Sequence, residues 1–146
     1  AITSGQRMYD ELDRLGLADA DELKTKAPAV LYDSIIKPNI EAGTALARKV
    51  ASRIDHPVVA PSIFEARKQR WSQDEYMAMW LKMIEENVGR IYMSPGWEYS
   101  NGGAEEFLHA AQMALGYRTR PDIEILDADD KPVRLHDGLV AIGEAL

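Results

Sequence analysis

Short apolar segments alternate with amphipathic segments along most of the chain, and this alternation constrains the fold more than any other feature. The segments predicted to be strands are residues 1–5, 56–62, 90–94 and 122–126. Helical spacing of apolar side chains predicts helices between them, at residues 6–17, 19–26, 40–54, 72–87 and 104–115. Strands separated by helices form a parallel sheet with helices on both faces. We therefore expect one domain over residues 1–146, with a doubly wound, mostly parallel sheet of four to five strands.

Local signals support several of these boundaries. The run at residues 56–62 is apolar and bounded by prolines, which is typical of a buried parallel strand. Ser72 and Glu75 have capping-box spacing and predict the start of a helix that continues to about Asn87. Gly116 is placed to end the helix before it. A hairpin is expected within residues 127–138 and a terminal helix at residues 139–146.

One region does not fit the alternation. Residues 27–39 contain β-prone side chains that are interrupted by polar residues and by Pro38. More broadly, the sequence leaves the role of residues 7–39 open. They could form a lid, an oligomer contact or a substrate-specific insertion.

Composition excludes several classes of function. The formal net charge is −7 and no basic stripe is present, so we do not expect duplex DNA or RNA as a partner. The chain has no cysteine, and its three histidines lie far apart, so we expect no metal site. No apolar run approaches the roughly 20 residues that span a bilayer, and no signal peptide opens the chain, so we expect a cytoplasmic protein without membrane contact.

Ligands of parallel α/β sheets bind in loops at the carboxyl ends of the strands. Three loops qualify here: residues 3–7, 61–72 and 95–103. The third is the most informative, because Gly102 and Gly103 let the backbone approach a ligand at the start of a helix. Glu105 and Glu106 are predicted in the first turn of that helix, where its dipole keeps a carboxylate ionised. Such a carboxylate can attack the anomeric carbon of a sugar, although both residues could equally be ordinary solvent-facing acids.

The segment around this loop resembles the nucleoside 2-deoxyribosyltransferase family, including the related deoxynucleoside 5′-monophosphate N-glycosidases. The residues that carry the resemblance are Pro95, Gly96, Trp97, Glu98, Ser100, Gly102, Gly103, Glu106 and Ala110. Weaker similarity extends over about residues 35–146. The resemblance implies a flavodoxin-like fold, no cofactor, and a homodimer or higher homo-oligomer.

The resemblance also implies roles for individual residues. Glu106, rather than Glu105, matches the family's nucleophile, because the spacing from Ser100 and to Ala110 fixes the register. The monophosphate-hydrolysing branch has a serine at the position of Ser100, near the sugar or phosphate. The glycine amides of the loop would help to hold the substrate, and Trp97 could stack on its base.

Two further site predictions lie outside this loop. In the first loop, Ser4 and Gly5 could bind the sugar or phosphate, and Arg7 could bind phosphate or simply be a surface arginine. The acid that family members use near the base has no counterpart, because Trp80 or Leu81 stands at its position. Asp74 is the better candidate for that acid, although it could also be an ordinary charge near a helix start.

Other side chains have a structural interpretation beside the functional one. Trp97 and Tyr99 could pack the loop against neighbouring helices instead of contacting a base. His109 is expected to be a partly satisfied surface histidine. The methionines and Trp80 between residues 76 and 84 are expected in the core or in an oligomer contact.

The sequence thus favours an enzyme that cleaves or transfers the N-glycosidic bond of a nucleoside or nucleoside 5′-monophosphate. The alternative is a non-catalytic nucleotide-binding or sensor module of the same fold. The absence of the acid that family members use near the base favours this alternative. A plain protein-interaction domain has no specific support. The base, the sugar, and the choice between hydrolase and transferase stay open.

Overall fold

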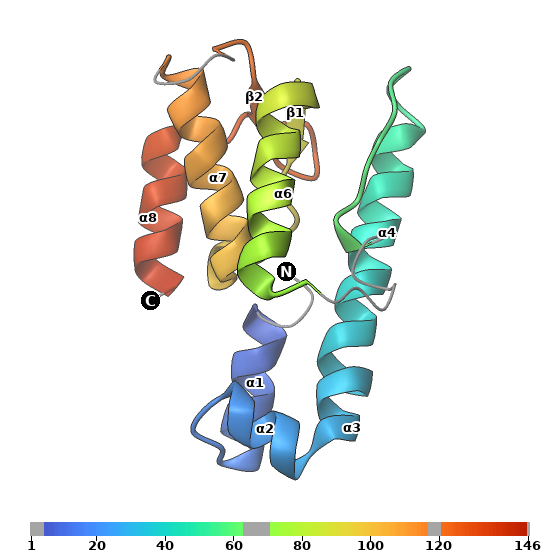
Figure 1. Cartoon of the computed structure of the whole chain (residues 1–146), viewed down its shortest axis with the longest axis vertical. Coiled ribbons are helices and arrows are strands. Elements are labelled where there is room, and N and C mark those ends of the chain that lie inside the picture. Colours follow the sequence, from blue (N-terminus) through green and yellow to red (C-terminus); the bar gives the residue numbers. More distant parts are fainter. Residues whose placement is uncertain (1–4, 63–70, 117–120, 146) are drawn as a thin grey trace.

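The computed structural model describes residues 5–62, 71–116 and 121–145, and this part of the chain is mostly helical (Figure 1). Strands β1 (Arg90–Tyr92) and β2 (Glu124–Leu126) pair in parallel, with Ile91 opposite Ile125. Helix α7 (Asn101–Ala114) connects them, which makes a β–α–β unit. The prediction of a flavodoxin-like, doubly wound sheet of four to five strands is wrong: the described residues contain this two-stranded sheet and no other.

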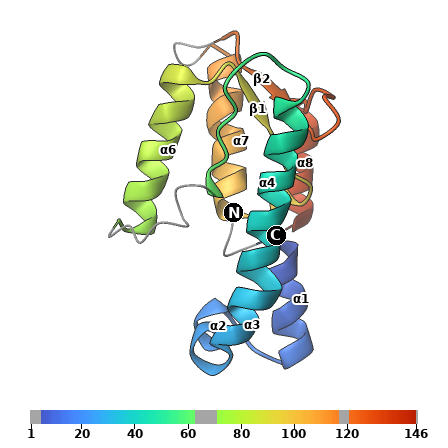
Figure 2. The same ribbon diagram turned by 90° about the vertical axis from the view of Figure 1, so that its right-hand side faces the viewer.

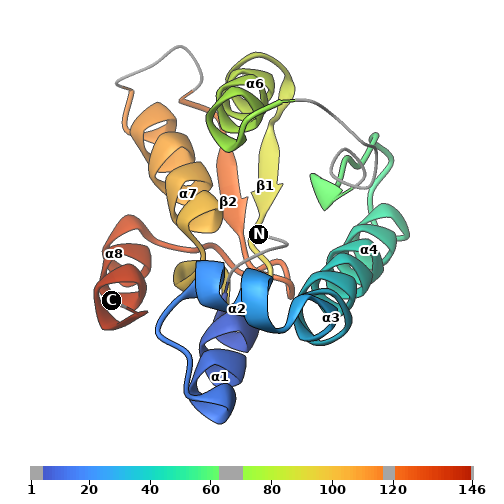
Figure 3. The same cartoon turned by 60° about the horizontal axis from the view of Figure 1, so that its bottom comes forward.

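Proline explains one of the missing strands. Residues 56–61 follow α4 (Lys37–Ala51) and run between that helix and β1 (Figures 1 and 3), but they form no strand. Pro57 and Pro61 have no N–H to donate to a sheet, and Val59 between them is 49% exposed. The other expected strand, at residues 1–5, lies almost entirely outside the described residues.

The main hydrophobic core lies between the sheet and two helices that cover it. Helix α6 (Gln73–Asn87) confirms the predicted capping box: the Ser72 hydroxyl accepts from the Glu75 amide at 3.2 Å, and the Ser72 amide donates to the Glu75 carboxylate at 2.8 Å. The buried core residues come from α6, from α7 and from the position just before β2. They are Trp80, Ile84, Ala110, Met113 and Ile123. Helix α8 (Leu135–Ala145) starts earlier than predicted and packs on α7 through Gly138 and the fully buried Phe107.

The N-terminal third forms a separate helical layer below this unit in Figure 1. It consists of α1 (Gln6–Leu15), α2 (Ala20–Lys26), α3 (Pro28–Val30) and the π-helical segment η1 (Leu31–Ile36), which continues into α4. Met8, Leu12, Leu23 and Ile35 form its own buried cluster. The β-prone residues at 27–39 are thus helical. Pro38 cannot donate the usual helical hydrogen bond, and the wider π turns before it accommodate that loss.

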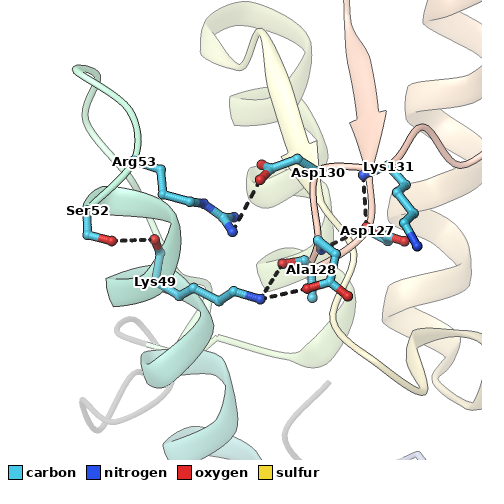
Figure 4. A network of polar contacts seen from close by, with 8 residues as sticks. Lys49, Ser52, Arg53, Asp127, Ala128, Asp130 and Lys131 are labelled. Carbon is cyan, nitrogen blue, oxygen red and sulfur yellow. Dashed lines mark hydrogen bonds and ion pairs between the residues drawn. The ribbon is translucent and has the colours of Figure 1, made fainter.

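A polar network fastens α4 to the turn that follows β2 (Figure 4). Lys49 Nζ donates to the Ala128 carbonyl at 2.9 Å and to Asp129 Oδ1 at 2.8 Å, and Arg53 pairs with Asp130 at 3.2 Å. Within the turn, the Asp127 amide donates to the Lys131 carbonyl at 2.8 Å. Leu126 also pairs with Pro132 in an antiparallel bridge, so the turn of the predicted hairpin is confirmed, whereas residues 135–138 of that hairpin belong to α8.

Candidate functional site

Helix α7 starts at Asn101, earlier than the predicted residue 104, because Ser100 caps it. The Ser100 hydroxyl accepts a hydrogen bond from the Gly103 amide at 3.0 Å, and the side chain is only 3% exposed. This is the N-cap geometry that serine favours. The hydroxyl hydrogen is not used in that bond, so Ser100 can still donate to another group.

The earlier start changes the position of the two acids on the helix. Asn101 to Ala104 form the first turn, so Glu105 and Glu106 lie in the second turn and the prediction of first-turn acids is wrong. The dipole's influence falls off within the first turn, so it supports these carboxylates less than expected. The two side chains also differ in environment: Glu105 is exposed, whereas Glu106 is half-buried. Glu106 therefore does not point wholly into solvent.

The two loop glycines have different structural roles. A Cβ atom at Gly103 would lie 2.5 Å from the Trp97 carbonyl oxygen, so Gly103 lets the start of α7 pack against the preceding turn. A Cβ atom at Gly102 would meet only the end of the Met77 side chain at 3.0 Å and the Ser100 hydroxyl at 3.9 Å. The Gly103 amide is engaged by the cap, whereas the helix offers no partner to the amides of Asn101 and Gly102.

Trp97 lies in the short 3₁₀ segment η2 (Trp97–Tyr99), where it packs on the protein interior. Its ring centroid is 4.7 Å from that of Phe107, with the planes tilted by 33°. Gly96 before it has a φ of 78°, a conformation that favours glycine. Of the two interpretations of Trp97, the packing contact is thus observed.

The first turns of α6 bring the second and third predicted loops together. The Tyr76 hydroxyl donates to the Pro61 carbonyl at 2.9 Å, and Met77 approaches Gly102 of α7. Asp74 lies three residues before Met77, so it shares that face of α6, and it is exposed. Figures 1 and 2 show that α6 and α7 both start at their lower ends in these views. Trp80, one of the two residues that the resemblance to the transferase family aligns with its acid, is buried in the core and only 5% exposed.

The first predicted loop is described only in part. Ser4 lies outside the described residues. Gly5 is buried, has a φ of 101°, and accepts from the Met8 amide at 2.9 Å as α1 begins. Arg7 is exposed, and its Nε donates to Asn39 Oδ1 at 3.1 Å, which ties α1 to the start of α4. A guanidinium has further N–H donors, so this bond leaves Arg7 able to bind an anion.

His109 is a buried residue, so the prediction of a surface histidine is wrong. It is 9% exposed and lies between α6 and α7, where its Nε2 is 4.0 Å from Glu85 Oε2. This ion pair holds only when the histidine is protonated. His109 therefore helps to join the two helices that carry Asp74 and Glu106.

Sequence reasoning overlooked Ser62, which follows the proline-bounded run of the second loop. Its side chain is 7% exposed, and its hydroxyl has no hydrogen-bond partner within the part of the chain that the structure describes. A polar residue at the end of an expected strand was the signal that could have singled it out.

The described residues contain neither a cluster of metal ligands nor a helix that could span a membrane. No cluster of three or more histidine, aspartate or glutamate side chains there could hold a metal ion. No helix in the same residues is both long enough and apolar enough to cross a membrane.

Comparison with known proteins identifies the family. Residues 35–117, more than half of the chain, match the family described as "Domain of unknown function (DUF4406)". The chain belongs to this family. The matched region runs from the end of η1 through α4, α6, β1 and α7, and it therefore contains Ser62, Asp74, Ser100 and Glu106. No curated protein and no solved structure matched the chain.

Proposed function

We propose that the protein cleaves or transfers the N-glycosidic bond of a nucleoside or nucleoside 5′-monophosphate, with Glu106 as the nucleophile. The proposal rests on the resemblance of residues 95–110 to the nucleoside 2-deoxyribosyltransferase family. The observation that carries it is the contrast between two adjacent acids. Glu106, which matches the family's nucleophile, is half-buried, whereas its neighbour Glu105 is exposed.

The reaction would proceed in two displacements. A Glu106 carboxylate oxygen attacks C1′ of the sugar, the bond from C1′ to the base nitrogen breaks, and its electron pair leaves with the base. Water or a second base then attacks C1′ and releases the Glu106 carboxylate. Each step inverts the anomeric carbon, so the product keeps the configuration of the substrate. Ser100 and the loop amides would hold the sugar or phosphate, and Arg7 would help with a phosphate.

The departing base nitrogen needs a proton, and Asp74 is the proposed donor. In the second step the Asp74 carboxylate takes a proton back from the attacking water or base. It shares a face of α6 with Met77, which contacts the first turn of α7. Asp74 takes no part in the capping box of that helix, which Ser72 and Glu75 form. Loss of this acid should slow poor leaving groups more than good ones.

The proposal includes a cytoplasmic location, small-molecule substrates and a homo-oligomeric state, with no cofactor. The apolar side chains of α8 are compatible with an oligomer, because Leu139 and Val140 are 47% and 44% exposed in the single chain.

The test is the release of free base from a panel of deoxynucleosides, ribonucleosides and their 5′-monophosphates. Glu106→Gln should lower base release at least about a thousand-fold, because it removes the nucleophile and keeps the side-chain shape. Glu105→Gln is the matched control on the same turn and should retain most activity. Full activity in the Glu106→Gln variant would contradict the assignment of the nucleophile.

A non-catalytic nucleotide-binding or sensor module is the second candidate. The burial of Trp80 in the core favours it, because no acid can act from the position that the family uses. Binding of a nucleotide by the wild-type protein without any release of base would support this candidate over the enzyme.

A further inference from the structure

His109 is a buried histidine on the side of α7 that packs against α6. It is 9% exposed, and its Nε2 atom lies 4.0 Å from Oε2 of Glu85 on α6. The contact between the two helices continues toward the start of α7, where a Cβ atom at Gly102 would lie 3.0 Å from the end of Met77. Burial favours the neutral imidazole, whereas a carboxylate nearby favours the protonated one. The charge of His109 therefore depends on the acids around it.

Two further acids lie one turn before His109 on its own helix. Glu105 and Glu106 precede it by four and three residues, the spacings at which side chains on a helix are neighbours. A helical side chain also leans toward the N-terminal end of its helix, so the imidazole extends over the turn that carries both acids. Glu105 is exposed, whereas Glu106 is half-buried. Water screens the charge of an exposed carboxylate, so Glu106 is the acid on α7 that interacts more strongly with His109.

The other described elements that pack against α7 carry several more charged groups. They are Asp74, Glu75, Lys82 and Glu86 on α6, Glu98 on η2, Glu124 on β2, and His136, Asp137 and Glu144 on α8. Those on α6, β2 and α8 are exposed, and Lys82 pairs with Glu86 at 3.6 Å. Glu98 is half-buried, but it precedes the capped start of α7, about two turns from His109. In the described structure, Glu85 and Glu106 are thus the acids that share the buried surroundings of His109.

We propose that His109 is a positioning residue whose imidazolium, stabilised by Glu85, keeps the carboxylate of Glu106 ionised and in place for attack on C1′. This inference rests on the proposed function, because it assigns a partner to the proposed nucleophile. Glu106 lies in the second turn of α7, where the helix dipole has little influence, so a nearby cation offsets the cost of its partial burial. His109 does not contact the substrate, and it exchanges no proton with the reacting atoms.

The interaction between the two residues can be measured without turnover. Linkage is reciprocal: the carboxylate stabilises the imidazolium by the same free energy by which the imidazolium stabilises the carboxylate. The midpoint of the His109 titration should therefore fall by about one pH unit in Glu106→Gln. It should also fall in Glu85→Gln. Glu105→Gln is the matched control and should change the midpoint much less, because Glu105 is exposed.

Nuclear magnetic resonance of the histidine rings in the full-length protein gives these midpoints. The chain has three histidines, and each signal is assigned by replacing that histidine with glutamine. The same spectra of the wild type provide the reference midpoint for every variant.

The pH profile of kcat/KM for base release is the second measurement. Attack requires the ionised carboxylate, so the acid limb of the profile should move about one pH unit higher in His109→Gln than in wild type. The two values of kcat/KM should converge at about pH 8, where Glu106 is ionised in both proteins. Glu85→Gln, which keeps the imidazole in place, should move the limb in the same direction. His136→Gln, at an exposed histidine on α8, is the control and should leave the limb unchanged.

The outcomes separate this inference from the proposed function. A His109 midpoint that is the same in wild type and in Glu106→Gln overturns the inference even if wild type releases base. A shifted midpoint without base release by wild type upholds the interaction between His109 and Glu106 and rejects the enzymatic proposal. A loss of activity in His109→Gln that is equal at every pH shows a purely structural role and overturns the inference. If His109→Gln does not fold, an acid limb that is unchanged in Glu85→Gln overturns it.

Discussion

Gly103→Ala should destabilise the protein, although alanine is normally the better helix former. Gly103 lies in the first turn of α7, where its Cα faces the carbonyl of Trp97. The added Cβ atom would lie 2.5 Å from that oxygen, and Cβ atoms in proteins essentially never approach another heavy atom to less than 3.0 Å. The oxygen belongs to the backbone, so the η2 turn or the helix start must move.

The size of the effect follows from two opposing terms. Replacing glycine by alanine in a helix gains up to about 1 kcal/mol. Overpacking at a rigid contact costs about 1–3 kcal/mol. Gly102→Ala is the matched variant, because it lies in the same turn and meets only the flexible end of Met77 at 3.0 Å and the Ser100 hydroxyl at 3.9 Å. The difference between the two variants therefore isolates the backbone clash.

Thermal and urea unfolding of both variants measure this difference. For a chain of this size, about 1–3 kcal/mol corresponds to a melting temperature roughly 3–10 °C lower in Gly103→Ala than in Gly102→Ala. If Gly103→Ala is as stable as Gly102→Ala, the first turn of α7 does not pack against the Trp97 carbonyl as closely as the structure shows. The capped geometry at Ser100 would then have to be reconsidered with it.

Three further predictions concern stability. Gly138→Ala would place a Cβ atom 2.1 Å from Cζ of the fully buried Phe107, so the free energy of unfolding in urea should fall by about 1–3 kcal/mol. Ser72→Ala removes the N-cap of α6 and should lower the free energy of unfolding by about 1 kcal/mol in the same assay. The hydrogen bond from Lys49 lowers the pKa of Asp129 below its ordinary value of 3.8. A carboxylate with a lowered pKa stabilises the fold above its unfolded pKa and loses that contribution as the pH falls through its folded pKa. Lys49→Ala should therefore be less stable than wild type near pH 6, and the difference should become smaller as the pH falls below about 3.8. A remainder is expected at low pH, because Lys49 also donates to the Ala128 carbonyl, and a difference that does not change with pH would contradict the ion pair.

The sequence correctly predicted several elements whose boundaries depend on residues close together in the chain. Ser72 and Glu75 specify the start of α6, since both partners of the capping box lie within one turn. The strand beginning at Arg90, the strand around Ile125 and the turn at residues 127–131 were likewise predicted. Ser100 lies just before α7, but the sequence did not reveal that its hydroxyl caps the helix, and its role in substrate binding stays a prediction.

Apart from the start of α7, the wrong predictions concern contacts between segments that are distant in the sequence. Whether residues 56–62 join the sheet depends on hydrogen bonds to another strand, and the sequence pattern does not contain those partners. The burial of His109 and the engagement of Gly103 with Trp97 also depend on how two elements meet. Periodicity shows which face of a helix is apolar, but it does not show which neighbour covers that face.

The sequence by itself determined the start of α6 and the turn after β2, because these depend on residues a few positions apart. Only the tertiary structure decided the extent of the sheet, the packing of Trp97 on Phe107 and the isolation of the Ser62 hydroxyl. Those features arise where α4, α6 and α7 come together across long stretches of chain, and packing and hydrogen bonding between such segments are properties of the folded molecule.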